Sequence, residues 1–149
     1  MRFFSILCLF ITILFLSNLS VHAEIIVSCK TTLDGQAYYH KGDYVKRSDS
    51  GWKKDKISNY EVELTVTNNN PDISFKDSTG RRQSALSSGG KVYIGGASKE
   101  YIHVVVLYPE ATTELYTFDF INNQLWNSIH KYGSTPVRKS ANFVGKCRF

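Results

Sequence analysis

The chain has 149 residues, with 18 Lys and Arg against 13 Asp and Glu and a formal net charge of +5. This length is that of one domain with a single core, and it excludes a chain of several domains. The basic excess is modest and scattered along the sequence. Together with the export signal described next, it argues against a nucleic-acid partner.

Residues 1–23 have the features of a secretory signal peptide. Arg2 precedes an apolar run, Phe3–Leu16, that only Ser5 and Thr12 interrupt, and Val21-His22-Ala23 resembles a cleavage site. A transmembrane anchor is the alternative, but the run is short for a span of about 20 residues. We therefore predict a signal peptide at 1–23, a single β domain at 24–149, export to the periplasm or the extracellular space, and no membrane span after signal removal.

Cys29 and Cys147 lie near opposite ends of the predicted mature domain. In an oxidising compartment such a pair predicts one disulfide bond. Because it closes almost the whole domain into a loop, it stabilises the fold by up to about 5 kcal/mol on the chain-entropy model. It also predicts that the first and last strands lie side by side. The alternative, a metal site, lacks a nearby His or third Cys.

The first part of the domain alternates short extended segments with turn signals. Ile25–Lys30 predicts a strand, Leu33-Asp34-Gly35 a turn, and Ala37–His40 a further extended segment. Tyr44–Arg47 predicts a short edge strand. Ser48–Ser58 predicts a long polar loop in which Trp52 folds back over the core as a lid, with an exposed binding aromatic as the alternative.

Asn59–Thr67 has the clearest strand pattern. Tyr60, Val62, Leu64 and Val66 alternate with Glu61, Glu63, Thr65 and Thr67, which predicts one buried face and one solvated face. The run Asn68-Asn69-Asn70-Pro71 predicts a turn. Three further strands are expected at Asp72–Lys76, Arg81–Leu86 and Lys91–Ile94.

Tyr101–Phe120 predicts a hairpin at the centre of the sheet. Tyr101–Tyr108 is apolar on both faces except at His103, Pro109–Thr112 makes the turn, and Thr113–Phe120 is rich in β-branched and aromatic residues. Gln124–Tyr132 predicts another strand, with a short helix as the alternative. Ser140–Cys147 is the last predicted strand, with Phe143 in the core. The fold class is therefore all-β, a small antiparallel up-and-down barrel, with a β-sandwich as the alternative.

No catalytic motif stands out. His40, His103 and His130 match no metal-ligand spacing, and His103 is expected to be a hydrogen-bonded histidine in the core or a pocket. Glu61 and Glu63, about 7 Å apart on one strand face, suit glycosidase chemistry in spacing, but a solvated pair is the expected state. We predict that the protein is not an enzyme and has no cofactor and no metal.

Two features predict a binding surface instead. The first is a basic cluster, Lys53-Lys54-Asp55-Lys56, next to Trp52, which is either a solvated loop or a contact for an anionic envelope component or an acidic protein. The second is the high Tyr content of the strands, because Tyr suits pocket rims and protein interfaces. The candidate binding residues are Trp52, Lys53, Lys54, Lys56, Ser88, Lys91 and Tyr93.

Several segments together resemble a group of small exported proteins of Gram-negative bacteria that has no assigned activity. They are the Cys29 segment with Tyr38-Tyr39, Asp49–Trp52 with Lys54-Asp55 and Ile57-Ser58, Asp77–Arg81, Val104–Pro109, Thr113–Phe118 and Phe143–Cys147. This resemblance implies export and implies no activity.

A weaker likeness is to the periplasmic inhibitors of C-type lysozyme, which are small disulfide-bearing β-barrels. The similar segment is Ser88–Tyr93. The resulting hypothesis is a secreted or periplasmic binding module of unknown ligand, followed by a periplasmic lysozyme inhibitor and then by a small hydrolase.

Overall fold

The computed structural model describes residues 24–76, 79–133 and 135–149, so the predicted signal peptide lies outside the described residues. The described chain forms one antiparallel sheet of nine strands, in the spatial order β4-β3-β2-β1-β9-β8-β7-β6-β5. The strands are β1 (Glu24–Tyr39), β2 (Gly51–Thr67), β3 (Asn70–Lys76), β4 (Arg82–Ser84), β5 (Lys91–Ala97), β6 (Tyr101–Tyr108), β7 (Thr112–Asp119), β8 (Gln124–Lys131) and β9 (Lys139–Lys146). Two 3-10 turns lie at Arg47–Asp49 and Pro109–Ala111.

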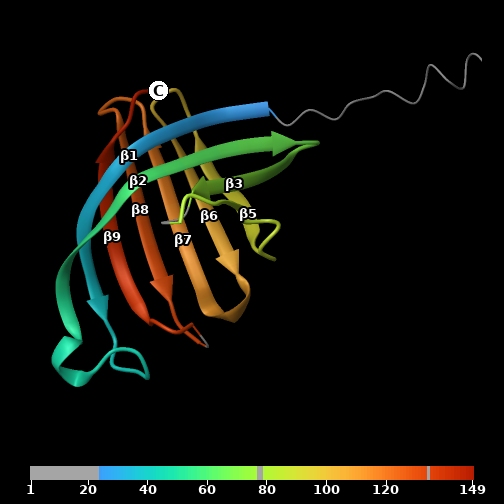
Figure 1. Ribbon diagram of the computed structural model, residues 1–149. Helices are drawn as coiled ribbons and strands as arrows, with labels where there is room; N and C mark the ends of the chain where they lie inside the picture. Colours follow the sequence, from blue (N-terminus) through green and yellow to red (C-terminus); the bar gives the residue numbers. More distant parts are fainter. Residues whose placement is uncertain (1–23, 77–78, 134) are drawn as a thin grey trace, which may run out of the picture.

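The sheet curls into a half-barrel because β1 and β2 are long and bent (Figure 1). The two strands pair with each other along their length, but β1 pairs with β9 only from Asp34 to Tyr39. The half of β1 that precedes Asp34 no longer pairs with β9. Together with the half of β2 paired to it, it passes across the front of β6–β8 (Figure 1). The prediction of an all-β, antiparallel, barrel-like fold is confirmed, as one curled sheet with an open side.

A β-bulge and two glycines mark the point where β1 leaves β9. The register between β1 and β2 shifts between Thr31 and Leu33, opposite Asn59, whose φ is 54°. A Cβ on Gly35 would lie 2.1 Å from the Asn142 carbonyl oxygen. A Cβ on Gly145 would lie 2.7 Å from the carbonyl oxygen of Thr32. The close crossing of β1 and β9 therefore requires glycine on both strands.

The core fills the space between the arching halves of β1 and β2 and the sheet behind them. Alternating residues of each strand point into it, as period-2 patterning requires. Its largest fully buried side chains include Tyr116, Phe118, Phe143, Leu33 and Leu64. The predicted inward face of Asn59–Thr67 is confirmed for Tyr60, Val62 and Leu64, which are all buried.

The Cys29–Cys147 disulfide is present, with 5.4 Å between the two Cα atoms. Both cysteines are buried. The bond joins β1 to the end of β9 beyond the last paired residues, Asp34 and Val144, and so holds the diverging strands together. The prediction that the first and last strands lie side by side is confirmed by the pairing of β1 with β9.

Three predictions for the first part of the domain are wrong. Leu33-Asp34-Gly35 is not a turn, because β1 runs unbroken to Tyr39 and Gly35 serves the crossing with β9. Tyr44–Arg47 is not a strand. Most of Ser48–Ser58 belongs to β2, because its alternating residues pair with the second half of β1. The polar composition of Ser48–Ser58 suggested a loop, but most of this segment is a strand whose outer face is solvated.

Later elements agree better with the sequence. Asn68 and Asn69 both have positive φ and form the two-residue turn between β2 and β3. Gln124–Lys131 is strand β8, so the helical alternative is wrong. The Tyr101–Phe120 hairpin exists as β6 and β7, but it lies toward one edge of the sheet, and β1 and β9 occupy the middle. Only one face of β6 is buried, since Leu107 on the other face is 42% exposed.

We expect that removing the disulfide lowers the free energy of unfolding by about 3–5 kcal/mol, because it closes a loop with a sequence separation of 118. The double variant Cys29→Ala, Cys147→Ala should show this loss in urea denaturation without reductant. Dithiothreitol should destabilise the wild type by a similar amount and leave the double variant unchanged. Equal midpoints for oxidised wild type and the variant would contradict the stabilising role of the bond.

Candidate functional site

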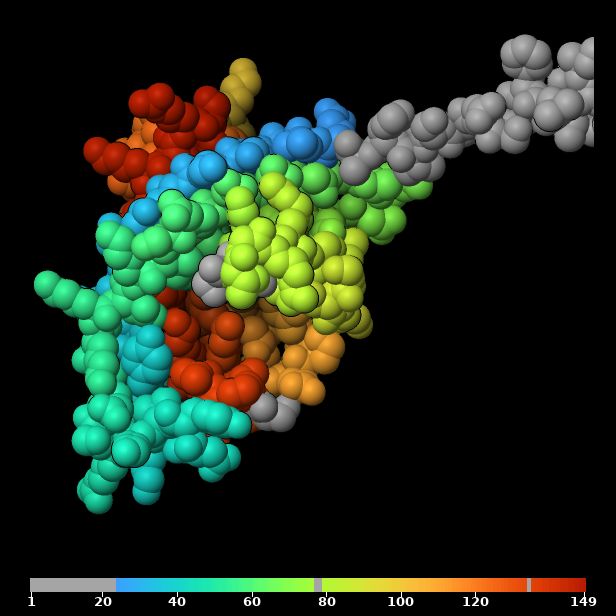
Figure 2. Space-filling view, in the orientation of Figure 1, coloured from blue at the N-terminus to red at the C-terminus, as the bar shows by residue number. Residues whose placement is uncertain are grey.

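The concave side of the half-barrel is open along the first half of β2, which pairs with β1 but not with β3. Figure 2 shows atoms of β8 and β9 (orange and red) through this opening, between the segment around residues 80–90 (yellow-green) and the connection from β1 to β2 (cyan). Two clefts lie here.

The first, the side cleft, has a volume of about 680 Å³. It is lined by residues 55–59 and 61 of β2, by Lys30, Lys76, Thr79 and Gly80, and by Lys139. The second, the rim cleft, has a volume of about 510 Å³. It is lined by Tyr39, Thr112, Lys131, Thr135, Pro136, Val137 and Lys139. The two clefts meet at Lys139, which is therefore the centre of the candidate site.

Lys139 is held by a carboxylate and by two aromatic rings. Its Nζ lies 2.8 Å from Oδ2 of Asp55, to which the Tyr39 hydroxyl also donates, at 2.9 Å. The ammonium lies 5.5 Å from the ring centres of Tyr39 and Phe143, within cation–π range. The backbone N–H of Lys56 donates to Oδ1 of Asp55. Each oxygen of the carboxylate thus has a donor.

These contacts set the ionisation of the cluster. Partial burial would raise the pKa of Asp55, but the hydrogen bonds from Lys139 and Tyr39 and the charge of Lys139 outweigh it and hold that pKa below its usual value. Burial, together with the hydrogen bond to Asp55 and its charge, raises the pKa of Tyr39 to about 12. At neutral pH the cluster is therefore an ion pair with a neutral phenol.

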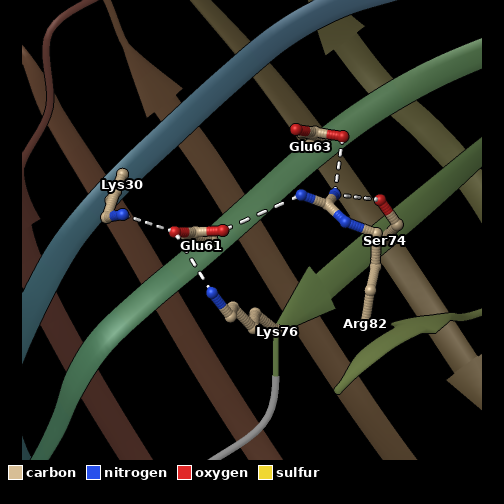
Figure 3. Close-up of polar contacts among 6 residues, drawn as sticks. All are labelled: Lys30, Glu61, Glu63, Ser74, Lys76 and Arg82. Atoms are coloured by element: carbon tan, nitrogen blue, oxygen red, sulfur yellow. Dashed lines mark hydrogen bonds and ion pairs between the residues drawn. The ribbon is translucent and has the colours of Figure 1, made fainter. Parts of the chain in front are cut away.

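Glu61 lies at the centre of an ion-pair network on the outer face of β2 (Figure 3). It is 2.7 Å from Lys30, 3.7 Å from Lys76 and 3.8 Å from Arg82. Arg82 also pairs with Glu63 at 2.6 Å. The hydrogen bond from Lys30, with the charges of Lys30, Lys76 and Arg82, holds the pKa of Glu61 below its usual value. Glu61 and Glu63 lie on the outer, solvent-facing side of β2 as expected, and they also form ion pairs there, Glu61 with Lys30, Lys76 and Arg82 and Glu63 with Arg82.

A buried carboxyl group lies deeper in the half-barrel. Glu114 of β7 is 7% exposed and accepts a hydrogen bond of 2.5 Å from the Tyr116 hydroxyl. Tyr116 is in turn 3.2 Å from the Tyr60 hydroxyl of β2. Burial raises the pKa of Glu114, and the hydrogen bond from Tyr116 and the charge of Lys131 only partly oppose it. The environment therefore favours the protonated acid.

Two further polar atoms are buried near the hydrogen bonds that join Glu114, Tyr116 and Tyr60. Asn127 is 1% exposed and donates to the Leu115 carbonyl oxygen, while its Oδ1 has no hydrogen-bond partner among the described residues. The Tyr108 hydroxyl is also buried; it faces the Glu114 carboxyl group, whose pKa it helps to lower, without reaching hydrogen-bond geometry. Sequence reasoning missed this polar interior. Its only signal was Glu114 and Asn127 at inward positions of otherwise apolar alternating strands.

The predicted binding residues fall into two separate groups. Trp52, Lys53, Lys54 and Lys56 lie on β2, while Ser88 lies in the turn after β4, and Lys91 and Tyr93 lie on β5. The order of strands places β1, β9, β8, β7 and β6 between β2 and β5. Lys56 lines the side cleft. Lys54 and Lys56 also line a separate cleft with Asp34, Gly35, Gln36 and Asp55, and Lys53 and Lys54 line a pocket with Tyr39 and Tyr44.

The aromatic residue of each group, Trp52 or Tyr93, is exposed. Trp52 is 62% exposed and its ring packs edge-to-face with that of Tyr38, with 5.6 Å between the ring centres, so it is not a lid on the core. Tyr93 is 50% exposed. Ser88 lies in a closed turn, where its backbone N–H and its hydroxyl both donate to the Ser84 carbonyl oxygen.

Each of the three described histidines lies against a hydroxyl group. His103 Nδ1 is 2.8 Å from Thr117 Oγ1, on the outer face of β6. His130 is 3.3 Å from Ser140 Oγ, and His40 is 3.3 Å from the Tyr132 hydroxyl. His103 is thus hydrogen-bonded as expected, but on the outer face rather than in the core.

No family model, no curated protein and no solved structure matches this chain. Within the described residues, no helix has the length and apolar character needed to cross a membrane.

The raised pKa of Glu114 predicts a specific pH dependence of stability. The unfolded chain releases this proton near pH 4.5, and the folded chain releases it only at higher pH. Wild-type stability should therefore fall as pH rises through that window, because ionisation costs more in the folded state. Glu114→Gln should lack this loss, so its free energy of unfolding relative to wild type should increase as pH rises above about 4.5 in urea denaturation.

Asp55→Asn is the matched control. The pKa of Asp55 is lowered, so its contribution is present above its usual value of 3.8 and is lost only as pH falls below it. The stability difference between Asp55→Asn and wild type should stay constant over the same pH range. If the free energies of unfolding of Glu114→Gln and of wild type changed in parallel with pH, Glu114 would ionise without cost in the fold and the prediction would be wrong.

Proposed function

We propose that this protein is an exported binding module, not an enzyme, and that it binds its ligand in the side and rim clefts of the half-barrel. The observation that carries the proposal is that two clefts of about 680 and 510 Å³ meet at Lys139 on the open side of the sheet. Both volumes lie in the range of small-molecule sites, roughly 300–1,000 Å³.

The arrangement of charged groups favours binding over catalysis. Asp55 is held by Lys139 and Tyr39, and Glu61 is held by three basic side chains, so each acid has its pKa lowered. A general acid or base at neutral pH needs a pKa near the working pH. Both carboxylates are better suited to orienting lysines than to transferring protons, and Glu114, whose pKa is raised, lines neither cleft.

The disulfide supports export. Disulfides persist in secreted and periplasmic proteins and are rare in the cytosol. The Cys29–Cys147 bond, together with the predicted signal peptide, supports a periplasmic or extracellular location.

Inhibition of C-type lysozyme is the second candidate. The observation that favours it is the exposure of Ser88, Lys91 and Tyr93 at one edge of the sheet, in the segment that resembles those inhibitors. Mixing the protein with C-type lysozyme in a cell-lysis assay tests this function directly. Unchanged lysis at an excess of the protein would reject it.

Filling the rim cleft tests the binding module. Val137→Trp should abolish retention of small molecules, because Val137 lines this cleft and is half-buried. The measurement is equilibrium dialysis of the folded protein against a small-molecule extract of bacterial envelopes, followed by mass spectrometry of what is retained.

The control is Ile121→Trp, since Ile121 is 64% exposed in the turn after β7 and lines neither cleft. It should retain the same molecules as the wild type. Equal retention by both variants would show that the rim cleft is not the binding site.

A further inference from the structure

Four neighbouring strands contribute one row of side chains to the floor of the rim cleft. In the sheet register Tyr39 of β1 is opposite Lys139 of β9, Lys139 is opposite Lys131 of β8, and Lys131 is opposite Thr112 of β7. All four residues line the cleft. The row therefore places two lysine residues side by side, between a tyrosine and a threonine.

Two like charges directly opposite each other on adjacent strands destabilise a sheet. Asp55 relieves this repulsion for Lys139, whose Nζ lies 2.8 Å from Asp55 Oδ2. Lys131 has no ion-pair partner among the described residues. One positive charge of the pair is thus left without a counter-charge.

The nearby acid does not supply that counter-charge. Lys131 acts on Glu114 through its charge, but Glu114 is 7% exposed and its own partner is the Tyr116 hydroxyl. Burial raises the pKa of Glu114 and favours the neutral acid. The groups that face Glu114 from the other elements are Tyr60 on β2, Tyr108 on β6 and Lys131 on β8.

The rest of the rim cleft is apolar or carries hydroxyl groups. Pro136, Val137 and the Tyr39 ring form an apolar wall. Thr112 contributes a hydroxyl, whereas the Thr135 hydroxyl donates to the Tyr132 carbonyl oxygen. None of the described lining residues is a carboxylate. A ligand here meets one uncompensated cation, hydrogen-bonding groups beside it and an apolar surface.

We infer that the rim cleft binds an organic anion, with its acidic group on Lys131 and its apolar body against Pro136, Val137 and the Tyr39 ring. The shared chemistry is a carboxylate or phosphate monoester on a small apolar body. This inference rests on the proposed binding function and gives the ligand class for the same site. The anion offsets the repulsion between Lys131 and Lys139 and makes a charge-assisted hydrogen bond.

The test uses isothermal titration calorimetry of the folded, oxidised protein with three probes. Benzoate and phenyl phosphate distinguish the two acidic groups, and benzyl alcohol is the neutral probe of similar shape. We expect at least one anion to bind, and benzyl alcohol to bind about tenfold more weakly or not at all.

Two substitutions at Lys131 test the assigned cation. Lys131→Gln should weaken binding of the anion by about tenfold or more. Lys131→Arg should keep most of the affinity because the charge is retained. Lys99→Gln, an exposed lysine in the turn before β6 that lines neither cleft, is the matched control and should bind like wild type.

Asp55→Asn should increase the affinity for the anion, which a merely structural role of Asp55 would not do. Removing this carboxylate leaves Lys139 without a counter-charge, so the anion should bind about threefold more tightly. Circular dichroism of each variant checks that the sheet is intact.

The outcomes separate this inference from the proposed function. Equal binding of benzyl alcohol and the anions, or unchanged affinity in Lys131→Gln, overturns the anionic ligand and leaves the binding module standing. Absence of binding by all three probes also overturns the anionic ligand, and the dialysis with Val137→Trp then decides the binding function on its own. Binding of the anions with the expected order of affinities supports both.

Discussion

The crossing of β1 over β9 is the constraint on which the rest of the structure depends. Gly35 and Gly145 let the two backbones approach closely, and the bulge at Asn59 turns β1 and β2 away from the sheet. The Cys29–Cys147 bond then fixes the distance between the strands after their pairing has ended. The arch that results covers the core, and it leaves the first half of β2 without a second neighbour.

The open side of the half-barrel follows from the same bend. Had β2 continued to pair with β3 along its whole length, the sheet would cover the region where the side and rim clefts lie. Instead β3 pairs with Glu61–Thr67, which is the second half of β2. Charged residues are among those that line the opening, and Asp55 and Lys139 neutralise each other there at 2.8 Å. Lys131, opposite Lys139, has no ion-pair partner among the described residues.

Polar groups inside the half-barrel distinguish it from a purely apolar core. The hydroxyls of Tyr60 and Tyr116 connect the arch to the sheet behind it and end on the Glu114 carboxyl group. Buried polar groups are costly when they have no partner, and hydrogen-bonded chains favour one arrangement of the core. The hydrogen bonds from Tyr60 through Tyr116 to Glu114 therefore help to set the position of the arch relative to the sheet and, with it, the shape of the clefts.

The sequence by itself determined the elements whose signals are local. Strict alternation in Tyr60–Leu64, the Asn68-Asn69 turn, the Tyr101–Phe120 hairpin and the cysteine pair all predicted what the structure contains, because each depends on neighbouring residues or on a single covalent bond. Only the tertiary structure decided that Gly35 is a crossing point rather than a turn, that the polar Gly51–Ser58 segment is a strand, and that Lys131 lies opposite Lys139. These features depend on contacts between residues far apart in the chain, and no local pattern of residue types encodes such contacts.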